Sequence, residues 1–340
     1  ELVTGAMSES RREDLQRRVA EGEVDLVIGT TALLNEGLSF RRLGLVVIDE
    51  QHKFGVRQRA ALRKAAEAPH FLVMTATPIP RTVTMALFGD LDVSTLRGAP
   101  AGRQTVHTYL GEESQRQQWW QFFGKKLREG RQGYVVVPRV EQTESDEVAS
   151  AEHLYEQLAN GPLSDFRVGL IHGRMPSAEK QAVMEDFRQR RTHVLIGTSV
   201  LEVGIDIPNA TLMTIESGER FGLAQLHQLR GRVRRGRFPG YVCVFASPNN
   251  DESHARLTAF VTSLDGFELA EVDFQLRGPG DPLGTRQHGM PKLRVADLHR
   301  DQELLEEARN VAQQLLTEPA AFFTPEYELL RTRVEKRLKV

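Results

Sequence analysis

The chain has 340 residues, of which 40% are hydrophobic and 26% are charged, and its formal net charge is −2. The length exceeds that of an ordinary single domain, and the composition is that of a folded protein and excludes a disordered chain. No apolar run approaches the ~20 residues that cross a bilayer, so we expect a cytoplasmic protein without membrane contact. Because the net charge is slightly negative, any surface that binds nucleic acid must be a local basic patch.

Short apolar runs alternate with segments of helical period over the first 250 residues. The predicted strands are residues 26–28, 45–48, 71–74, 134–137, 168–171, 194–196 and 212–215. Residues 8–20 and 178–190 have the length and period of helices, and Ser177 is expected to cap the second. This alternation predicts an α/β fold in which helices cover both faces of parallel sheets.

The predicted domain boundaries follow from breaks in this pattern. Glycine and proline interrupt it at residues 97–102, which predicts a linker between two α/β lobes. After about residue 250 the alternation stops, and residues 303–316 and 325–338 are predicted helices, the second with Thr324 as cap and Pro325 at its first position. We therefore expect lobes at residues 1–97 and 105–250, a linker at 98–104, and a mostly helical segment at 251–340.

The predicted strand 45–48 ends in Asp49, Glu50, Gln51 and His52. Four apolar residues in a row are typical of a strand buried on both faces, and charges at its end are costly unless metal, phosphate or water meets them. A nucleotide-hydrolysing motor holds Mg²⁺ through one such acid and orients the attacking water through the next. The alternatives are a buried strand that enters a polar turn and a metal-hydrolase centre, for which a second ligand cluster is missing.

Polar residues also follow other predicted strands, at the ends where open parallel sheets bind ligands. They include Thr30, Thr31, Thr75, Thr77 and Thr198. Further along, residues 230–237 contain five arginines in eight positions. A guanidinium group pairs with phosphate through two hydrogen bonds, so this segment predicts an anion site. The alternatives are a solvated basic helix end and a general nucleic-acid patch.

Together these motifs resemble those of superfamily 2 helicases, and of the RecG family of branch-migration helicases in particular. The superfamily resemblance rests on residues 49–52, 75–78, 197–206 and 228–235. The RecG resemblance rests on residues 49–56, 77–82 and 276–287. Transcription-repair coupling factors are the nearest alternative. The corresponding motif of those factors usually has Glu and Gln at the positions of Gln51 and His52, so these two residues favour the RecG family.

The resemblance implies two RecA-like parallel-sheet lobes, the first incomplete, followed by a translocation hairpin and loop. It implies an ATP- and Mg²⁺-dependent motor that remodels branched double-stranded DNA in recombination and repair, with single-stranded-DNA-binding protein as a candidate partner. The glycine loop with lysine that cradles phosphates does not occur in the sequence. We therefore expect a fragment of a monomeric parent that does not hydrolyse ATP alone, and an idle DNA- or partner-binding fragment is the alternative. An incomplete sheet leaves apolar surface uncovered, so we expect the fragment to associate.

The resemblance also implies a role for each candidate nucleotide-site residue. Asp49 holds Mg²⁺, and Glu50 activates or positions the attacking water. Arg232 and Arg235, set in place by Gln228, stabilise charge on the γ-phosphate, and Gly204 and Asp206 lie near the nucleotide. Arg234 stands where the family usually has glycine, and its side chain could crowd the turn that directs Arg235.

The remaining candidates bind DNA or couple hydrolysis to movement. The residues expected to contact DNA are Thr30, Thr31, Thr198 and Arg286. The residues expected to act in coupling are Gln51, His52, Thr75, Thr77, Arg277 and Gln287. Phosphate contacts of this kind position a translocase without reading sequence.

Overall fold

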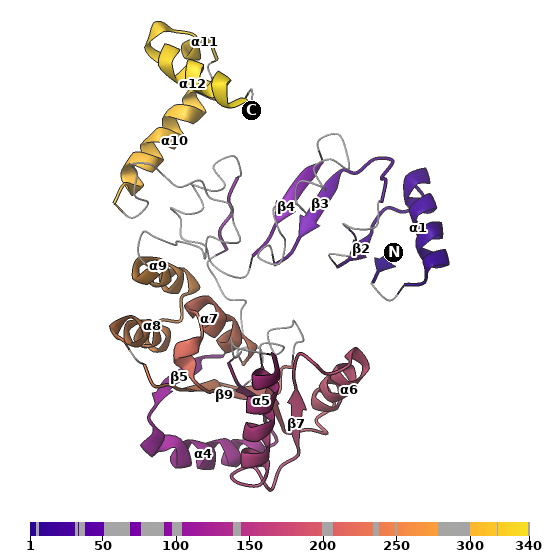
Figure 1. The fold of residues 1–340 in the computed structure, drawn as a ribbon, viewed down its shortest axis with the longest axis vertical. Helices are drawn as coiled ribbons and strands as arrows, with labels where there is room; N and C mark the ends of the chain where they lie inside the picture. Colours follow the sequence, from indigo (N-terminus) through magenta and orange to yellow (C-terminus); the bar gives the residue numbers. More distant parts are fainter. Residues whose placement is uncertain are drawn as a thin grey trace. The chain divides into compact units, whose positions relative to one another are not determined.

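The computed structural model describes residues 1–4, 7–30, 33, 38–50, 69–75, 92–96, 104–138, 144–198, 207–233, 238–248, 250–277, 300–317 and 319–338. These residues fall into two compact units, one within residues 1–75 and one from residue 92 onward (Figure 1). The expected linker at 98–104 lies outside the described residues except for residue 104, so the domain boundaries stay predictions. No described helix is long and apolar enough to cross a membrane.

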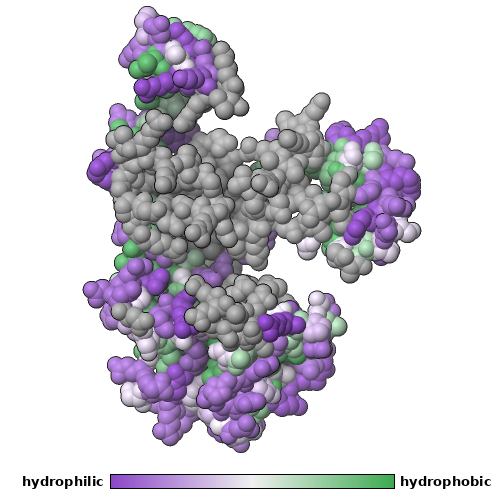
Figure 2. All heavy atoms as spheres, viewed as in Figure 1, coloured by the Kyte–Doolittle hydropathy of each residue, from purple (hydrophilic) through white to green (hydrophobic). Residues whose placement is uncertain are grey.

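The described residues of the first unit form two separate pairs of parallel strands and one helix. Strands β1 (Leu2–Val3) and β2 (Ile28–Gly29) pair with each other, as do β3 (Leu45–Ile48) and β4 (His70–Val73). Helix α1 (Glu9–Glu21) packs Leu15 and Val19 against Val3, because residues four apart lie on one helix face. Hydrophilic residues cover its other side, as Figure 2 shows.

Strand β3 is not buried on both faces, contrary to the sequence prediction. Ile48 is buried, but Leu45 is 56% exposed and Val47 is 53% exposed, and Leu72 on β4 is 50% exposed. A parallel sheet needs cover on both faces, and a pair of strands alone is marginal in water. The burial predicted for this strand from its apolar run is therefore wrong for Leu45 and Val47.

The second unit is built on a six-stranded parallel sheet in the order β5-β10-β9-β6-β8-β7 (Figure 1). The strands are β5 (Val106–Gly111), β6 (Gln132–Val136), β7 (Val168–Ile171), β8 (Val194–Gly197), β9 (Ala210–Ile215) and β10 (Gly240–Phe245). The helices are α4 (Arg116–Arg128), α5 (Glu144–Ala159), α6 (Ser177–Arg188), α7 (Leu223–Arg232), α8 (Asp251–Thr262) and α9 (Gly266–Arg277). The predicted α/β architecture is confirmed.

Helices cover both faces of this sheet, and each face has its own core. One core contains Trp119 and Phe123 of α4 with Leu158 of α5. The other takes residues from α6, α7, α8 and α9, including Phe187 and Phe260. Every residue of the central strands β6, β8 and β9 is buried, which is why these strands consist mostly of apolar residues.

Further helices follow in the C-terminal part of the chain. They are α10 (Gln302–Thr317), α11 (Pro319–Phe322) and α12 (Glu328–Leu338). Thr324 and Pro325 begin a turn of 3₁₀ helix, η6 (Pro325–Tyr327), and the α-helix starts after it. The predicted helices are therefore confirmed, with the start of the last one shifted by three residues.

One local prediction was wrong, and one strand was missed. Ser177 does not cap α6, because it is the first helical residue and Pro176 occupies the cap position without a side-chain hydrogen bond. Strand β5 was missed because it is an edge strand whose residues alternate in burial and so lack a continuous apolar run.

The close approach of α4 to β6 generates a stability prediction. A Cβ atom on Gly133 would lie 2.4 Å from Cζ of Phe123 and 3.0 Å from Cβ of Leu212, whereas one on Gly173 would meet nothing within 4 Å. Gly133→Ala should therefore lower the free energy of unfolding by about 1–3 kcal/mol through overpacking. Gly173→Ala is the matched control, and denaturant midpoints measure both. Equal midpoints for the two variants would contradict the packing.

Candidate functional site

Asp49 and Glu50 follow β3 directly and have different surroundings. Asp49 is exposed, and its Oδ1 accepts a hydrogen bond of 2.8 Å from the backbone nitrogen of Glu50. Glu50 is half-buried and has a φ of 52°, in the left-handed region that side chains other than glycine rarely adopt. Such a conformation costs on the order of 1–3 kcal/mol and is concentrated at functional sites.

The surroundings of Asp49 fit Mg²⁺ held together with a nucleotide. Magnesium in nucleotide sites is usually bound by one or two carboxylates together with substrate phosphates and water. Among the residues that the structure describes, no group of three histidine, cysteine or acidic side chains is placed to hold a metal. Asp49 would supply one carboxylate to such an ion.

Helix α7 carries Gln228 and Arg232, which lie four residues apart on one side of the helix. Both are half-buried. Leu226 and Leu229 face the core, so the helix is anchored while Gln228 and Arg232 lie closer to its surface. The two residues that the sequence assigns to one site are therefore brought together.

Arg230 does not belong to the anion site that the run of arginines predicted. Its side chain is buried, and Nη1 donates to the carbonyl oxygens of Phe260 at 2.7 Å and Ser263 at 2.8 Å. The guanidinium also lies 4.5 Å from the centre of the Phe260 ring. Nη2 lies 3.1 Å from Nδ1 of His227, so the Arg230 side chain is bonded inside the protein, whereas that of Arg232 is half-buried.

Thr198 and Arg232 lie at opposite edges of the sheet. Thr198 follows β8, at the carboxyl ends of the strands. Helix α7 runs back from the end of β9 to the start of β10. Val233, which follows α7, lies against Gly240, the first residue of β10: a Cβ on Gly240 would be 2.6 Å from the Val233 carbonyl oxygen. The end of α7 is therefore at the amino edge, and the candidate phosphate contact at Thr198 is separate from it.

The carboxyl edge holds two polar groups that have no hydrogen-bond partner within the described part of the chain. They are Oγ1 of Thr198, whose side chain is fully buried, and Nδ1 of half-buried His172, which follows the neighbouring strand β7. Buried polar groups are nearly always hydrogen-bonded to protein or to ordered water, so these two atoms are candidates for a ligand contact. A phosphate cannot reach a fully buried hydroxyl, so a DNA contact through Thr198 requires its cover to be displaced. Sequence reasoning missed His172, although it is a polar residue directly after a predicted strand.

An ion pair at the same edge was also missed. Arg116, the first residue of α4, donates two hydrogen bonds of 2.7 and 3.1 Å to Glu216, which follows β9. Its guanidinium lies 4.0 Å from the centre of the Phe245 ring. Burial acts to lower the pKa of Arg116, but hydrogen bonds to Glu216 and Glu113 outweigh burial and raise it. Glu216 is thus occupied by arginine and is not a free metal ligand.

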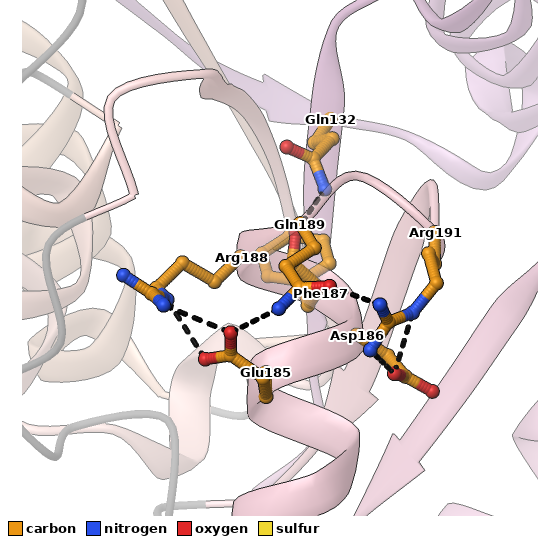
Figure 3. Close-up of polar contacts among 7 residues, drawn as sticks. All are labelled: Gln132, Glu185, Asp186, Phe187, Arg188, Gln189 and Arg191. Atoms are coloured by element: carbon orange, nitrogen blue, oxygen red, sulfur yellow. Dashed lines mark hydrogen bonds and ion pairs between the residues drawn. The ribbon is translucent and has the colours of Figure 1, made fainter.

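At the amino edge, Gln132 joins three segments. Its Nε2 donates to the carbonyl oxygens of Phe187 at 2.6 Å and Thr192 at 2.8 Å, and its Oε1 accepts from Asn209 at 3.0 Å. Figure 3 shows Gln132 beside the end of α6. Gln132 therefore holds Asn209, just before β9, against the end of α6 and the residues that follow it.

Surface ion pairs surround the end of α6 in the same view (Figure 3). Arg188 and Gln189 donate to Glu185, and Arg191 pairs with Asp186. Hydrogen bonds from Arg188 and Gln189 lower the pKa of Glu185 to about 2. These groups are exposed and satisfy one another, so they stabilise the helix end and provide no vacant site.

The other predicted site residues are exposed or not described. Thr30 and Thr75, which follow β2 and β4, are both exposed. Arg277 is the last residue of α9, and only its backbone is described. Outside the described residues lie Thr31, Gln51, His52, Thr77, Gly204, Asp206, Arg235, Arg286 and Gln287.

Protein-family models match most of the chain. A DEAD/DEAH box helicase model matches residues 1–86, and a helicase conserved C-terminal domain model matches residues 116–237. A solved structure of a single-substitution variant of S. cerevisiae Dbp5, bound to RNA and ADP BeF3, gives a TM-score of 0.52 at 16% identity and shows likeness of the fold alone. With a parallel sheet and motif residues at its edges, these matches define a superfamily 2 helicase chain of RecA-like fold.

More specific matches identify the family. Residues 263–340 match the model "ATP-dependent DNA helicase RecG, domain 3, C-terminal". The RecG helicase of Synechocystis sp. is 44% identical over 94% of the chain, and that of Streptococcus pneumoniae is 42% identical over 99%. A solved structure of RecG bound to a three-way DNA junction is 40% identical, covers 90% of this chain and 39% of that one, and gives a TM-score of 0.66. The chain belongs to the RecG family, and it spans 38% and 50% of the length of these two curated relatives.

The unpartnered hydroxyl of Thr198 leads to a stability prediction. Thr198→Val should leave the free energy of unfolding unchanged or raise it, because valine keeps the shape and removes a buried group that has no partner. Thr214→Val is the matched control, since Oγ1 of this equally buried threonine accepts a 2.8 Å hydrogen bond from Nε1 of Trp119. The control should lose about 1–3 kcal/mol in urea unfolding. An equal loss in both variants would show that the Thr198 hydroxyl supports the fold.

Proposed function

We propose that this chain is the motor portion of an ATP-dependent translocase that remodels branched double-stranded DNA. The observation that carries the proposal is the likeness to RecG proteins along nearly the whole chain, including a structure of RecG bound to a three-way DNA junction. The positions of Asp49, Glu50 and Arg232 at the ends of a strand and a helix support it.

In this proposal the nucleotide site uses two neighbouring acids and an arginine. Asp49, which is exposed, holds the Mg²⁺ of ATP, and half-buried Glu50 positions the attacking water. ATP with Mg²⁺ supplies the phosphoanhydride bond whose hydrolysis drives movement. Arg232, placed by α7 and assisted by Gln228, stabilises charge that develops on the γ-phosphate, an effect worth roughly 10³–10⁵ in rate. Gly204, Asp206 and Arg235 complete the site as predictions from the sequence.

The DNA side of the proposal uses the carboxyl edge of the second sheet. Thr198 and His172 have polar atoms there without hydrogen-bond partners in the described part of the chain, and a DNA phosphate is an acceptor that suits a threonine hydroxyl. In this proposal Arg232 contacts nucleotide at the amino edge of the second sheet, and DNA binds at the carboxyl edge. The sheet between the two edges can then transmit movement from the nucleotide to the DNA. Thr30, Thr31 and Arg286 are proposed as further phosphate contacts.

Several expectations from the sequence stay predictions. They concern a single-stranded-DNA-binding protein as partner, a monomeric parent, association of the 340-residue chain, and its inability to hydrolyse ATP alone. An idle DNA- or partner-binding chain is the second candidate function, favoured by the lack of a glycine loop with lysine in the sequence. Measuring ATP turnover by the chain and by the full-length gene product separates the two candidates.

The role of Arg232 gives a direct test of the proposed function. In the full-length gene product, Arg232→Ala should lower DNA-stimulated ATP turnover by roughly 10³-fold or more, because charge on the γ-phosphate loses its partner. Affinity for a DNA fork, measured by fluorescence anisotropy, should stay close to that of the unmodified protein. Arg191→Ala is the control, since Arg191 pairs with Asp186 on the surface and should affect neither quantity. Loss of DNA binding with intact turnover would make Arg232 a DNA contact instead.

A further inference from the structure

Arg116 and Glu216 form a partly buried ion pair at the carboxyl edge of the second sheet. Nη1 and Nη2 of Arg116 donate to the two carboxylate oxygens of Glu216 at 2.7 and 3.1 Å, and the Glu216 side chain is only 13% exposed. Nε of Arg116 donates to Glu113, but that side chain is 79% exposed and hydrated. A carboxylate withdrawn from water is costly unless a cation pairs with it. Arg116 is therefore the group that neutralises Glu216.

Glu216 lies close to the candidate phosphate contact at Thr198. The backbone nitrogen of Glu216 donates to the carbonyl oxygen of Val136 at 2.9 Å. On the other side of β6, the backbone nitrogen of Val137 donates to the carbonyl oxygen of Gly197 at 2.9 Å. Glu216 and Thr198 therefore follow the two strands that flank β6, in one row across the sheet. Two spacings between neighbouring strands place them roughly 10 Å apart.

The two residues also belong to the same side of the sheet. Leu212 of β9 and Ile196 of β8 both lie in the core that α4 covers. Side chains alternate between the two faces of a strand, so every second residue continues the same row. Glu216 comes four residues after Leu212, and Thr198 comes two residues after Ile196. The carboxylate and the proposed phosphate site thus share one side of the carboxyl edge.

An uncompensated negative charge on Glu216 would oppose DNA at this edge. At roughly 10 Å, Coulomb's law gives an effect of about 2-fold on affinity in bulk water and more than 10-fold at an effective dielectric constant of ~20. Salt screens partly buried charges less than exposed ones, and Glu216 is partly buried. The pair with Arg116 removes this repulsion.

We propose that Arg116 sets the affinity of the carboxyl edge for DNA by cancelling the charge of Glu216 beside the phosphate site. Arg116 acts through Glu216 and needs no contact of its own with DNA. This inference rests on the proposed function for the position of the DNA. It adds an arginine outside the helicase motifs on which DNA binding depends.

The test measures dissociation constants of the 340-residue chain for a fluorescent DNA fork, by anisotropy at ~0.1 M salt, where the Debye length is ~10 Å. Arg116→Gln should weaken binding roughly 2- to 10-fold, because the charge of Glu216 is then unbalanced. Glu216→Gln should bind at least as tightly as the unmodified chain. The double variant should return to within about 2-fold of the unmodified chain, since the charge that Arg116 cancels is gone. Weaker binding in both single variants would show a purely structural pair and overturns the proposal.

Two further variants control for charge and geometry. Arg128→Gln removes the same charge from the other end of α4, about 18 Å along the helix, where Arg128 pairs with Asp165 at 3.0 Å. It should leave the dissociation constant unchanged. Arg116→Lys keeps the charge and should bind nearly as the unmodified chain does. A loss in Arg128→Gln equal to that in Arg116→Gln, or a lysine variant as weak as the glutamine variant, overturns the proposal.

The double variant also separates this inference from a direct contact between Arg116 and DNA. A lost contact leaves the double variant as weak as Arg116→Gln and lowers the slope of log affinity against log salt by about 1, and that result overturns the proposal. So does a lack of fork binding by the unmodified chain. If the full-length gene product shows no DNA-dependent ATP turnover, the proposed function fails, and the dissociation constants of the chain still decide the inference.

Discussion

Burial of the central parallel strands on both faces determines where the second unit can do chemistry. Strands β6, β8 and β9 have no exposed residue, and two separate cores cover the two faces of the sheet. Buried polar groups are costly unless paired, so ligands can be met only at the ends of the strands. The polar residues of interest lie accordingly at two edges, with Thr198 and His172 at one and the end of α7 at the other.

The same constraint explains why neighbouring arginines have different surroundings. On a helix that packs against a sheet, a shift of two residues moves a side chain from the buried side towards the surface. Arg230 is on the buried side of α7 and bonds to the end of α8, whereas Arg232 is half-buried at the end of the helix. A compact motif can therefore hold a contact for phosphate and a structural link to the following helices at once.

Much of the fold could be predicted from the sequence, because strands buried on both faces are continuous apolar runs. Residues 168–171, 194–196 and 212–215 were found in this way and correspond to β7, β8 and β9. Strand β5 was missed because it lies at the sheet edge and alternates in burial. The burial of residues 45–48 was overestimated, since a run of apolar residues says nothing about whether its cover is present.

The site was only partly predictable, for a related reason. Motifs suggested Asp49, Glu50, Gln228 and Arg232 as candidates because each motif is local in the sequence. The pair Arg116–Glu216 joins residues 100 positions apart, and the partners of Arg230 lie about 30 residues away, so no local pattern signals either contact. Burial of Thr198 also depends on the folded environment.

The most direct test of the motor assignment is ATP turnover by the full-length gene product, with Glu50→Gln as the matched variant. Turnover is measured without DNA, with linear duplex and with a three-way junction. A DNA-remodelling motor predicts the highest turnover with the junction, and its loss in Glu50→Gln while junction binding persists. Turnover that does not respond to DNA, or that survives in Glu50→Gln, would contradict the assignment.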